Sequence, residues 1–133
     1  MTAELDDRTV AYIVVAQSCF EDLKQVAGQL AGLLVLSAAG SQSAGPDHPL
    51  LKSAEEVYRQ AADALGGVHV SARASLHHDH LLRACTKLGA VLRSLHARGD
   101  ALPLLDSAFE DLRAASRTLP GFPMISFERG CCA

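Results

Sequence analysis

The residues best suited to chemistry in this sequence are three histidines, His77, His78 and His80, and two adjacent cysteines, Cys131 and Cys132. Imidazole nitrogens and thiolates bind transition metals, and an imidazole is also a common haem ligand. The i, i+3 spacing of His77 and His80 brings two imidazoles to adjacent turns of a helix. Adjacent cysteines bind soft metal ions or become oxidised. These five residues are therefore the candidate ligand or metal positions.

The same residues also have a purely structural explanation, in which the histidines end a hydrophobic core and each makes a hydrogen bond. Helical bundles that bind metals through bridging carboxylates carry Glu-x-x-His pairs, and the sequence contains none. Cys19 and Cys85 lie on apolar seams, where a cysteine is usually an inert buried thiol. The sequence thus leaves the cofactor open between none, a metal ion and a haem.

The three histidines stand at one end of a helix predicted over residues 71–98. At about 100° per residue, its apolar positions fall on one side of the helix. These positions are Leu81, Cys85, Leu88, Leu92 and Leu95. One turn back, the seam reaches His77 and His78, so two imidazoles stand where the pattern would otherwise supply leucines.

Three more helices must pack around the helix that carries these histidines. Apolar seams between Gly- and Pro-containing breaks predict them over residues 7–39, 50–66 and 101–117. Short connections favour antiparallel neighbours. The predicted fold is an all-α, four-helix up-and-down bundle, with residues 1–133 forming one domain.

The last part of the chain is predicted to be an irregular tail. Pro120 and Pro123 forbid helix there, so residues 118–133 are expected to be non-helical. In an up-and-down bundle, the departing tail shares one end of the molecule with Tyr12 and His77. A pocket at this end is one place where a small ligand, a metal or a haem could bind.

Composition excludes two classes of partner. Lys and Arg number 12 against 15 Asp and Glu, and they are scattered, so no surface supplies the phosphate neutralisation that nucleic acids need. The most apolar run, residues 26–39, is shorter than the roughly 20 residues that span a bilayer. The N-terminal segment is acidic where a secretory signal would be positive. We therefore expect a cytoplasmic protein without a nucleic-acid or membrane partner.

Signatures of catalysis are missing from the sequence. It has no serine in a GxSxG elbow, no cysteine adjacent to a histidine and no Gly-rich phosphate loop. A well-specified scaffold without a catalytic constellation favours a binding or interaction protein over an enzyme.

One stretch, LHHDHLLRACTKLGA at residues 76–90, resembles the phospho-acceptor segment of histidine phosphotransfer domains. Those domains are helical bundles with a solvent-facing histidine, a lysine three residues on and a glycine next to it. Here His80 is followed by Arg83 in place of the lysine, by Ala84 in place of the first glycine, and later by Gly89. The resemblance implies an alternative function, in which His80 accepts a phosphoryl group in a phosphorelay.

The first helix carries more apolar surface than a bundle core uses. Val10 and Val14 point away from its main seam, and soluble monomers seldom leave such a patch uncovered. Either the tail covers the patch within the same molecule, or a second molecule covers it across a two-fold axis. The sequence predicts a homodimer, although a different protein partner would use the same surface. The predicted interface residues are Val10, Val14, Phe122, Ile125 and Phe127.

Overall fold

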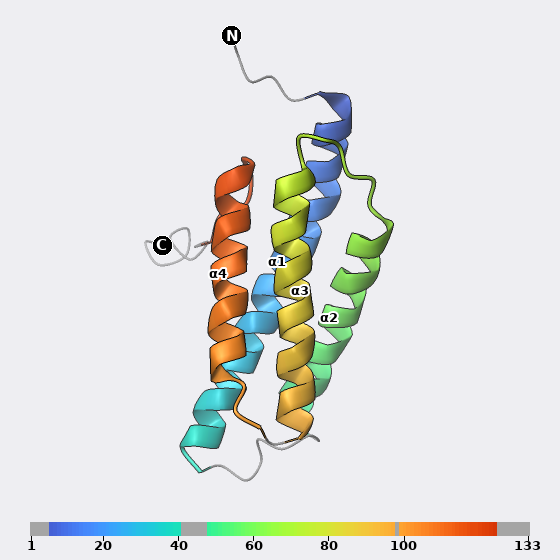
Figure 1. Ribbon diagram of the computed structural model, residues 1–133. Coiled ribbons are helices and arrows are strands. Elements are labelled where there is room, and N and C mark those ends of the chain that lie inside the picture. The colour runs from blue at the N-terminus through green and yellow to red at the C-terminus, as the bar shows by residue number, and fades with distance from the viewer. Residues whose placement is uncertain (1–5, 41–47, 98, 125–133) are drawn as a thin grey trace, which may run out of the picture.

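Four helices make up most of the described chain in the computed structural model (Figure 1). They are α1 (Asp7–Ala38), α2 (Pro49–Gly67), α3 (Ser75–His96) and α4 (Leu102–Thr118). The structure describes residues 6–40, 48–97 and 99–124. Within these residues no β-strand occurs. The predicted all-α, four-helix bundle is therefore confirmed.

Local sequence signals fix the ends of the helices. The Asp6 carboxylate accepts a hydrogen bond of 3.1 Å from the amide of Thr9, which caps the start of α1. Gly40, with φ +82°, follows the end of this helix in a conformation that favours glycine. At the start of α2 the ring of His48 accepts a hydrogen bond of 3.0 Å from the amide of Leu50. Helix capping thus accounts for a histidine to which the sequence pattern gave no role.

The central elements are α1 and α3, because each of them contacts all three other helices. Helix α1 packs chiefly against α2, while α3 packs chiefly against α4, and successive helices run in opposite directions (Figure 1). Within the described residues α2 and α4 do not touch, so the closer diagonal of the bundle is the one between α1 and α3. The largest fully buried apolar side chains are Tyr12, Phe20, Leu23, Leu30, Leu33, Leu51, Leu81, Leu88, Leu105 and Leu112.

The start of α3 differs from the sequence prediction, which placed it at Ser71. The Ser71 hydroxyl accepts a hydrogen bond of 3.2 Å from the amide of Ala74, and this bond closes a turn before the helix. The same hydroxyl lies 2.7 Å from the buried hydroxyl of Thr9. Residues 71–74 therefore form a turn anchored on α1, and the helix begins at Ser75.

Leu102 begins α4 but lies outside the buried apolar seam of this helix. That side chain is 53% exposed. The buried apolar positions are Leu105, Ala108, Leu112 and Ala115.

After α4 the chain turns back onto the bundle. Leu119 and Phe122 are buried, and Met124 packs against the core. The turn passes through Gly121, whose φ of +94° is one that other residues rarely adopt. Leu119, Phe122 and Met124 therefore extend the core of the bundle beyond α4.

Candidate functional site

The side chain of His77 is fully buried near the start of α3, with 0% of its surface exposed. Its Nδ1 atom lies 2.7 Å from the hydroxyl oxygen of Tyr12 on α1, and the two rings meet edge to face. Either atom can donate, depending on the tautomer of the imidazole. This hydrogen bond gives the buried imidazole a polar partner and joins α1 to α3 across the bundle.

Burial determines the charge of this pair. It lowers the pKa of His77 from 6.5 to about 4, because a buried imidazolium loses its hydration, and His78 and His80 act in the same direction. Burial likewise raises the pKa of Tyr12 above its usual value. Both partners are therefore neutral near pH 7. The Nε2 atom of His77 is also buried and has no hydrogen-bond partner among the described residues.

Phe122 closes this site from the side of the tail. Its ring centroid lies 4.0 Å from that of His77 and 5.3 Å from that of Phe20, with an edge-to-face arrangement toward Phe20. Because Phe122 is buried within its own chain, it does not provide the free surface expected of an interface residue. Phe122 is buried because its ring covers the imidazole of His77 and the phenyl ring of Phe20.

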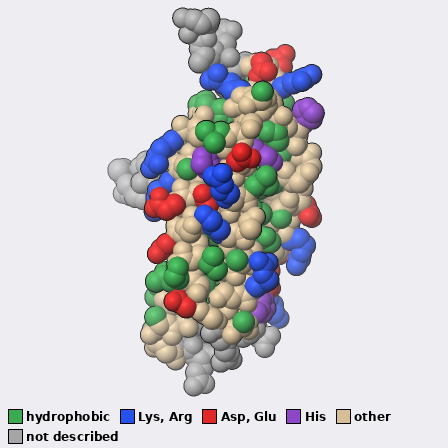
Figure 2. All heavy atoms as spheres, viewed as in Figure 1, with side chains coloured by type: hydrophobic (Ala, Val, Ile, Leu, Met, Phe, Trp, Pro, Cys, Tyr) green, Lys and Arg blue, Asp and Glu red, His purple; other side chains and the backbone are tan. Residues whose placement is uncertain are grey.

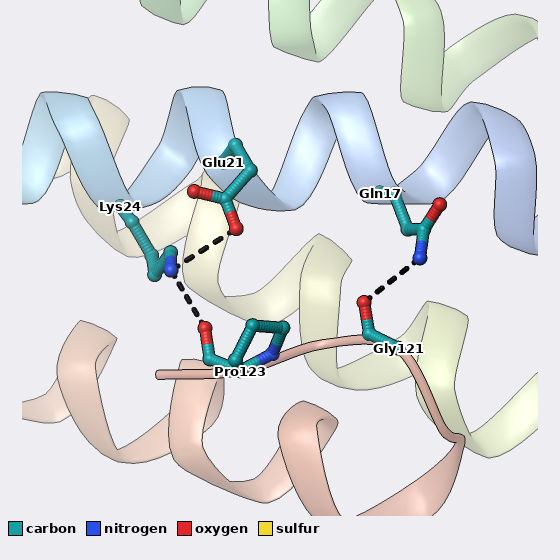
Figure 3. A network of polar contacts seen from close by, with 5 residues as sticks. All are labelled: Gln17, Glu21, Lys24, Gly121 and Pro123. Atoms are coloured by element: carbon teal, nitrogen blue, oxygen red, sulfur yellow. Dashed lines mark hydrogen bonds and ion pairs between the residues drawn. The ribbon is translucent and has the colours of Figure 1, made fainter. Parts of the chain in front are cut away.

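Side chains of α1 hold the backbone of the tail (Figure 3). Gln17 donates a hydrogen bond of 3.0 Å to the carbonyl oxygen of Gly121, and Lys24 donates one of 2.6 Å to that of Pro123. Lys24 also pairs with Glu21 at 3.0 Å. The tail therefore runs between α1 and α4, and it runs in the direction in which α1 itself runs (Figure 3).

His78 and His80 are only partly buried, on the flanks of α3. The ring of His78 lies edge-on to Tyr12, with centroids 5.9 Å apart. Burial lowers the pKa of His78, and the nearby charge of Asp79 opposes this shift. Each of the two rings has a buried Nδ1 atom without a hydrogen-bond partner in the described chain. Figure 2 shows histidine side chains on either side of an acidic one over the upper part of α3.

These histidines are not brought together as a ligand set. Across residues 6–40, 48–97 and 99–124, no group of three or more His, Cys, Asp or Glu side chains is placed to hold a metal ion. The ring of His77 is bonded to Tyr12 and covered by Phe122. A metal ion or haem at His77 would therefore require the tail to move.

Cys19 and Cys85 are free, buried thiols, as their positions on apolar seams predicted. Burial raises the pKa of both, so little reactive thiolate forms near neutral pH. The Tyr58 hydroxyl on α2 opposes the shift in the pKa of Cys85. Cys131, Cys132, Ile125 and Phe127 lie outside the described residues.

Gly89 serves the contact between α2 and α3. A Cβ atom at this position would meet the Tyr58 hydroxyl and would stand 3.1 Å from Cζ of the same ring. In the phosphotransfer resemblance a glycine lies near the phospho-acceptor. Here the space above Gly89 is filled by Tyr58, so internal packing accounts for this glycine.

The N-terminal half of α1 exposes two adjacent apolar rows. Val10 and Val14, predicted to lie in an interface, are 46% and 65% exposed, and Val15 beside them is 41% exposed. Val15 lines an open groove of about 480 Å³ between α1 and α2, together with Ala64 and Val68. The described part of the tail leaves both rows uncovered.

Sequence reasoning missed a second groove, at the other end of α1. We call it the α1/α4 groove; its volume is about 510 Å³. It is lined by Ala31, Leu34, Val35, Ser37, Ala38, Gly99, Asp100, Ala101, Leu102, Leu105, Asp106 and Phe109. The available signal was Val35, an apolar residue off the main seam of its helix.

Comparisons of the chain with protein-family models, with curated proteins and with solved structures give no match. Among the helices described, none combines the length and the hydropathy needed to cross a membrane.

Proposed function

We propose that this protein is a non-catalytic interaction protein that forms a homodimer through the N-terminal half of α1. The observation that carries the proposal is the exposure of Val10 and Val14 beside the groove that Val15 lines. A raised apolar row next to an apolar groove is self-complementary, which is what a two-fold interface requires. In such an interface, Val10 and Val14 of each protomer occupy the groove of the other.

Charges at the edge of this surface support the same arrangement. Asp7 precedes Val10 by three residues and therefore extends the valine row. Arg8 lines the groove, with His69 on the opposite wall. If the two α1 helices run parallel across the two-fold axis, Asp7 of each row lies at the level of Arg8 in the partner's groove, so charge favours this arrangement.

Sedimentation equilibrium at micromolar concentration tests this proposal. Wild type should show twice the mass of one chain, and Val14→Glu should shift it toward the mass of one chain. Val35→Glu is the matched control, because Val35 lies on the same helix with a similar exposure of 68%, and it should stay dimeric. A monomeric wild type would contradict the proposal, as would equal dissociation by both variants. Circular dichroism confirms that each variant keeps its helices.

Phosphotransfer at His80 is the second candidate, and one observation favours it. His80 is partly exposed on a helix of a four-helix bundle, the architecture that the resemblance implies. Incubation with a phosphorylated response regulator tests this function. An acid-labile phosphoryl group on wild type, absent from His80→Ala, would support phosphotransfer, and its absence from both would contradict it. His78→Ala is the control, since it changes the neighbouring imidazole on the same turn.

A further inference from the structure

The α1/α4 groove has an apolar wall and an acidic rim. Val35 and Leu102 are 68% and 53% exposed there. Asp100 and Asp106 also line the groove, and none of its lining residues is basic. Figure 2 shows hydrophobic side chains with an acidic one among them over the lower end of α4. The groove therefore suits a short segment that carries apolar side chains and a positive charge.

The tail enters the same interhelical space from the opposite end. Gly121 lies against Gln17 and Pro123 against Lys24, so the tail follows α1 toward its C-terminal end (Figure 3). The groove lies farther along this path, between the end of α1 and the start of α4. The described part of the tail, which ends at Met124, therefore runs in the direction of the groove.

The next residues have the length and the chemistry to fill it. In extended chain at about 3.3 Å per residue, Phe127 lies about 13 Å beyond Pro123 and Arg129 about 20 Å beyond it. At 1.5 Å per helical residue, these distances correspond to about nine and thirteen residues of α1 beyond Lys24, near the levels of Leu33 and Ser37. Both levels lie along the groove.

We propose that residues 125–129 of this chain dock into the α1/α4 groove. Ile125 and Phe127 cover its apolar wall, and Arg129 lies beside Asp100 and Asp106. In extended chain these three side chains share one face. Phe122 and Met124 pack on the core from even-numbered positions, so docking of the odd-numbered side chains requires the chain to rotate about its axis after Met124.

Paramagnetic relaxation enhancement on the full chain tests the docking. Cys19 and Cys85 are buried, so in a Cys132→Ser variant a nitroxide reagent labels Cys131. We expect broadening of the resonances of Val35, Leu102 and Phe109, with the label reduced by ascorbate as the diamagnetic reference. Val35→Glu and Phe127→Ser should each remove this localised broadening. Val14→Glu changes an equally exposed valine at the far end of α1 and should keep it.

Two results would overturn the proposal. One is broadening that does not favour the groove, or that survives both Val35→Glu and Phe127→Ser. The other comes from mixing isotope-labelled chains without the nitroxide with unlabelled chains that carry it. If the groove resonances of the isotope-labelled chains broaden in this mixture as strongly as in the singly labelled protein, a second copy supplies the occupant.

Discussion

The hydrogen bond between Tyr12 and His77 makes a quantitative prediction. Tyr12→Phe removes the hydroxyl and leaves Nδ1 of His77 unpaired in the core, where Nε2 already has no partner among the described residues. One of the two ring nitrogens must carry a hydrogen, so a buried N–H is then left without an acceptor. Such a loss costs about 1–3 kcal/mol of the free energy of unfolding. With a urea m-value of about 2 kcal/mol/M, the unfolding midpoint falls by about 0.5–1.5 M.

A double-mutant cycle isolates this bond from other effects. His77→Leu supplies the apolar side chain that the seam of α3 would otherwise carry, but it orphans the Tyr12 hydroxyl. The double variant Tyr12→Phe/His77→Leu removes both polar groups and should be less destabilised than the sum of the single variants by about 1 kcal/mol or more. Urea denaturation followed by circular dichroism measures all four proteins.

The control for this cycle is Tyr58→Phe, which deletes the hydroxyl of a side chain that is only partly buried. Its cost should be below about 1 kcal/mol. If the costs of Tyr12→Phe and His77→Leu simply add, to within about 0.5 kcal/mol, the bond does not stabilise the fold as argued.

Two further predictions concern pH and close packing. The pKa of His77 is about 4 in the folded chain and near 6.5 when unfolded, so between these pH values only the unfolded state binds the proton. Stability is therefore fully present above about pH 6.5 and should fall by about 3 kcal/mol as pH decreases to 4, a slope that His77→Leu should flatten in urea titrations. Gly89→Ala should lower the free energy of unfolding by about 1–3 kcal/mol, because its methyl group meets Tyr58. Gly28→Ala, where nothing lies within 4 Å, should instead raise it by about 0.5–1 kcal/mol in the same assay. Equal effects of the two alanines, or a pH profile unchanged by His77→Leu, would contradict these accounts.

The sequence was sufficient to predict the bundle and the composition of its buried end. Helical periodicity placed His77 on the core side of α3, and the up-and-down topology placed it near Tyr12 and the tail. The hydrogen bond and the packing of Phe122 confirm that arrangement. Such inferences succeed because apolar spacing and chain direction alone decide which faces and which ends meet.

The spacing of apolar residues does not predict contacts between specific atoms. The pattern predicts a helical Ser71, because nothing local reveals that its hydroxyl meets Thr9, 62 positions earlier in the chain. Gly89 resembles a phosphotransfer glycine, since the sequence does not show that Tyr58 fills the space beside it. The α1/α4 groove depends on how far the ends of two helices diverge, which is set by packing over the whole bundle.

The return of the tail to the bundle has a consequence for biosynthesis. The core around His77 is completed by Phe122, which is made only after all four helices. A nascent chain whose tail has not yet emerged and docked therefore leaves Phe20 and the imidazole uncovered, and chaperones and proteases recognise such exposed apolar surface. Docking of Phe122 removes that signal. In the cell, the docked tail would thus mark a bundle whose core is closed.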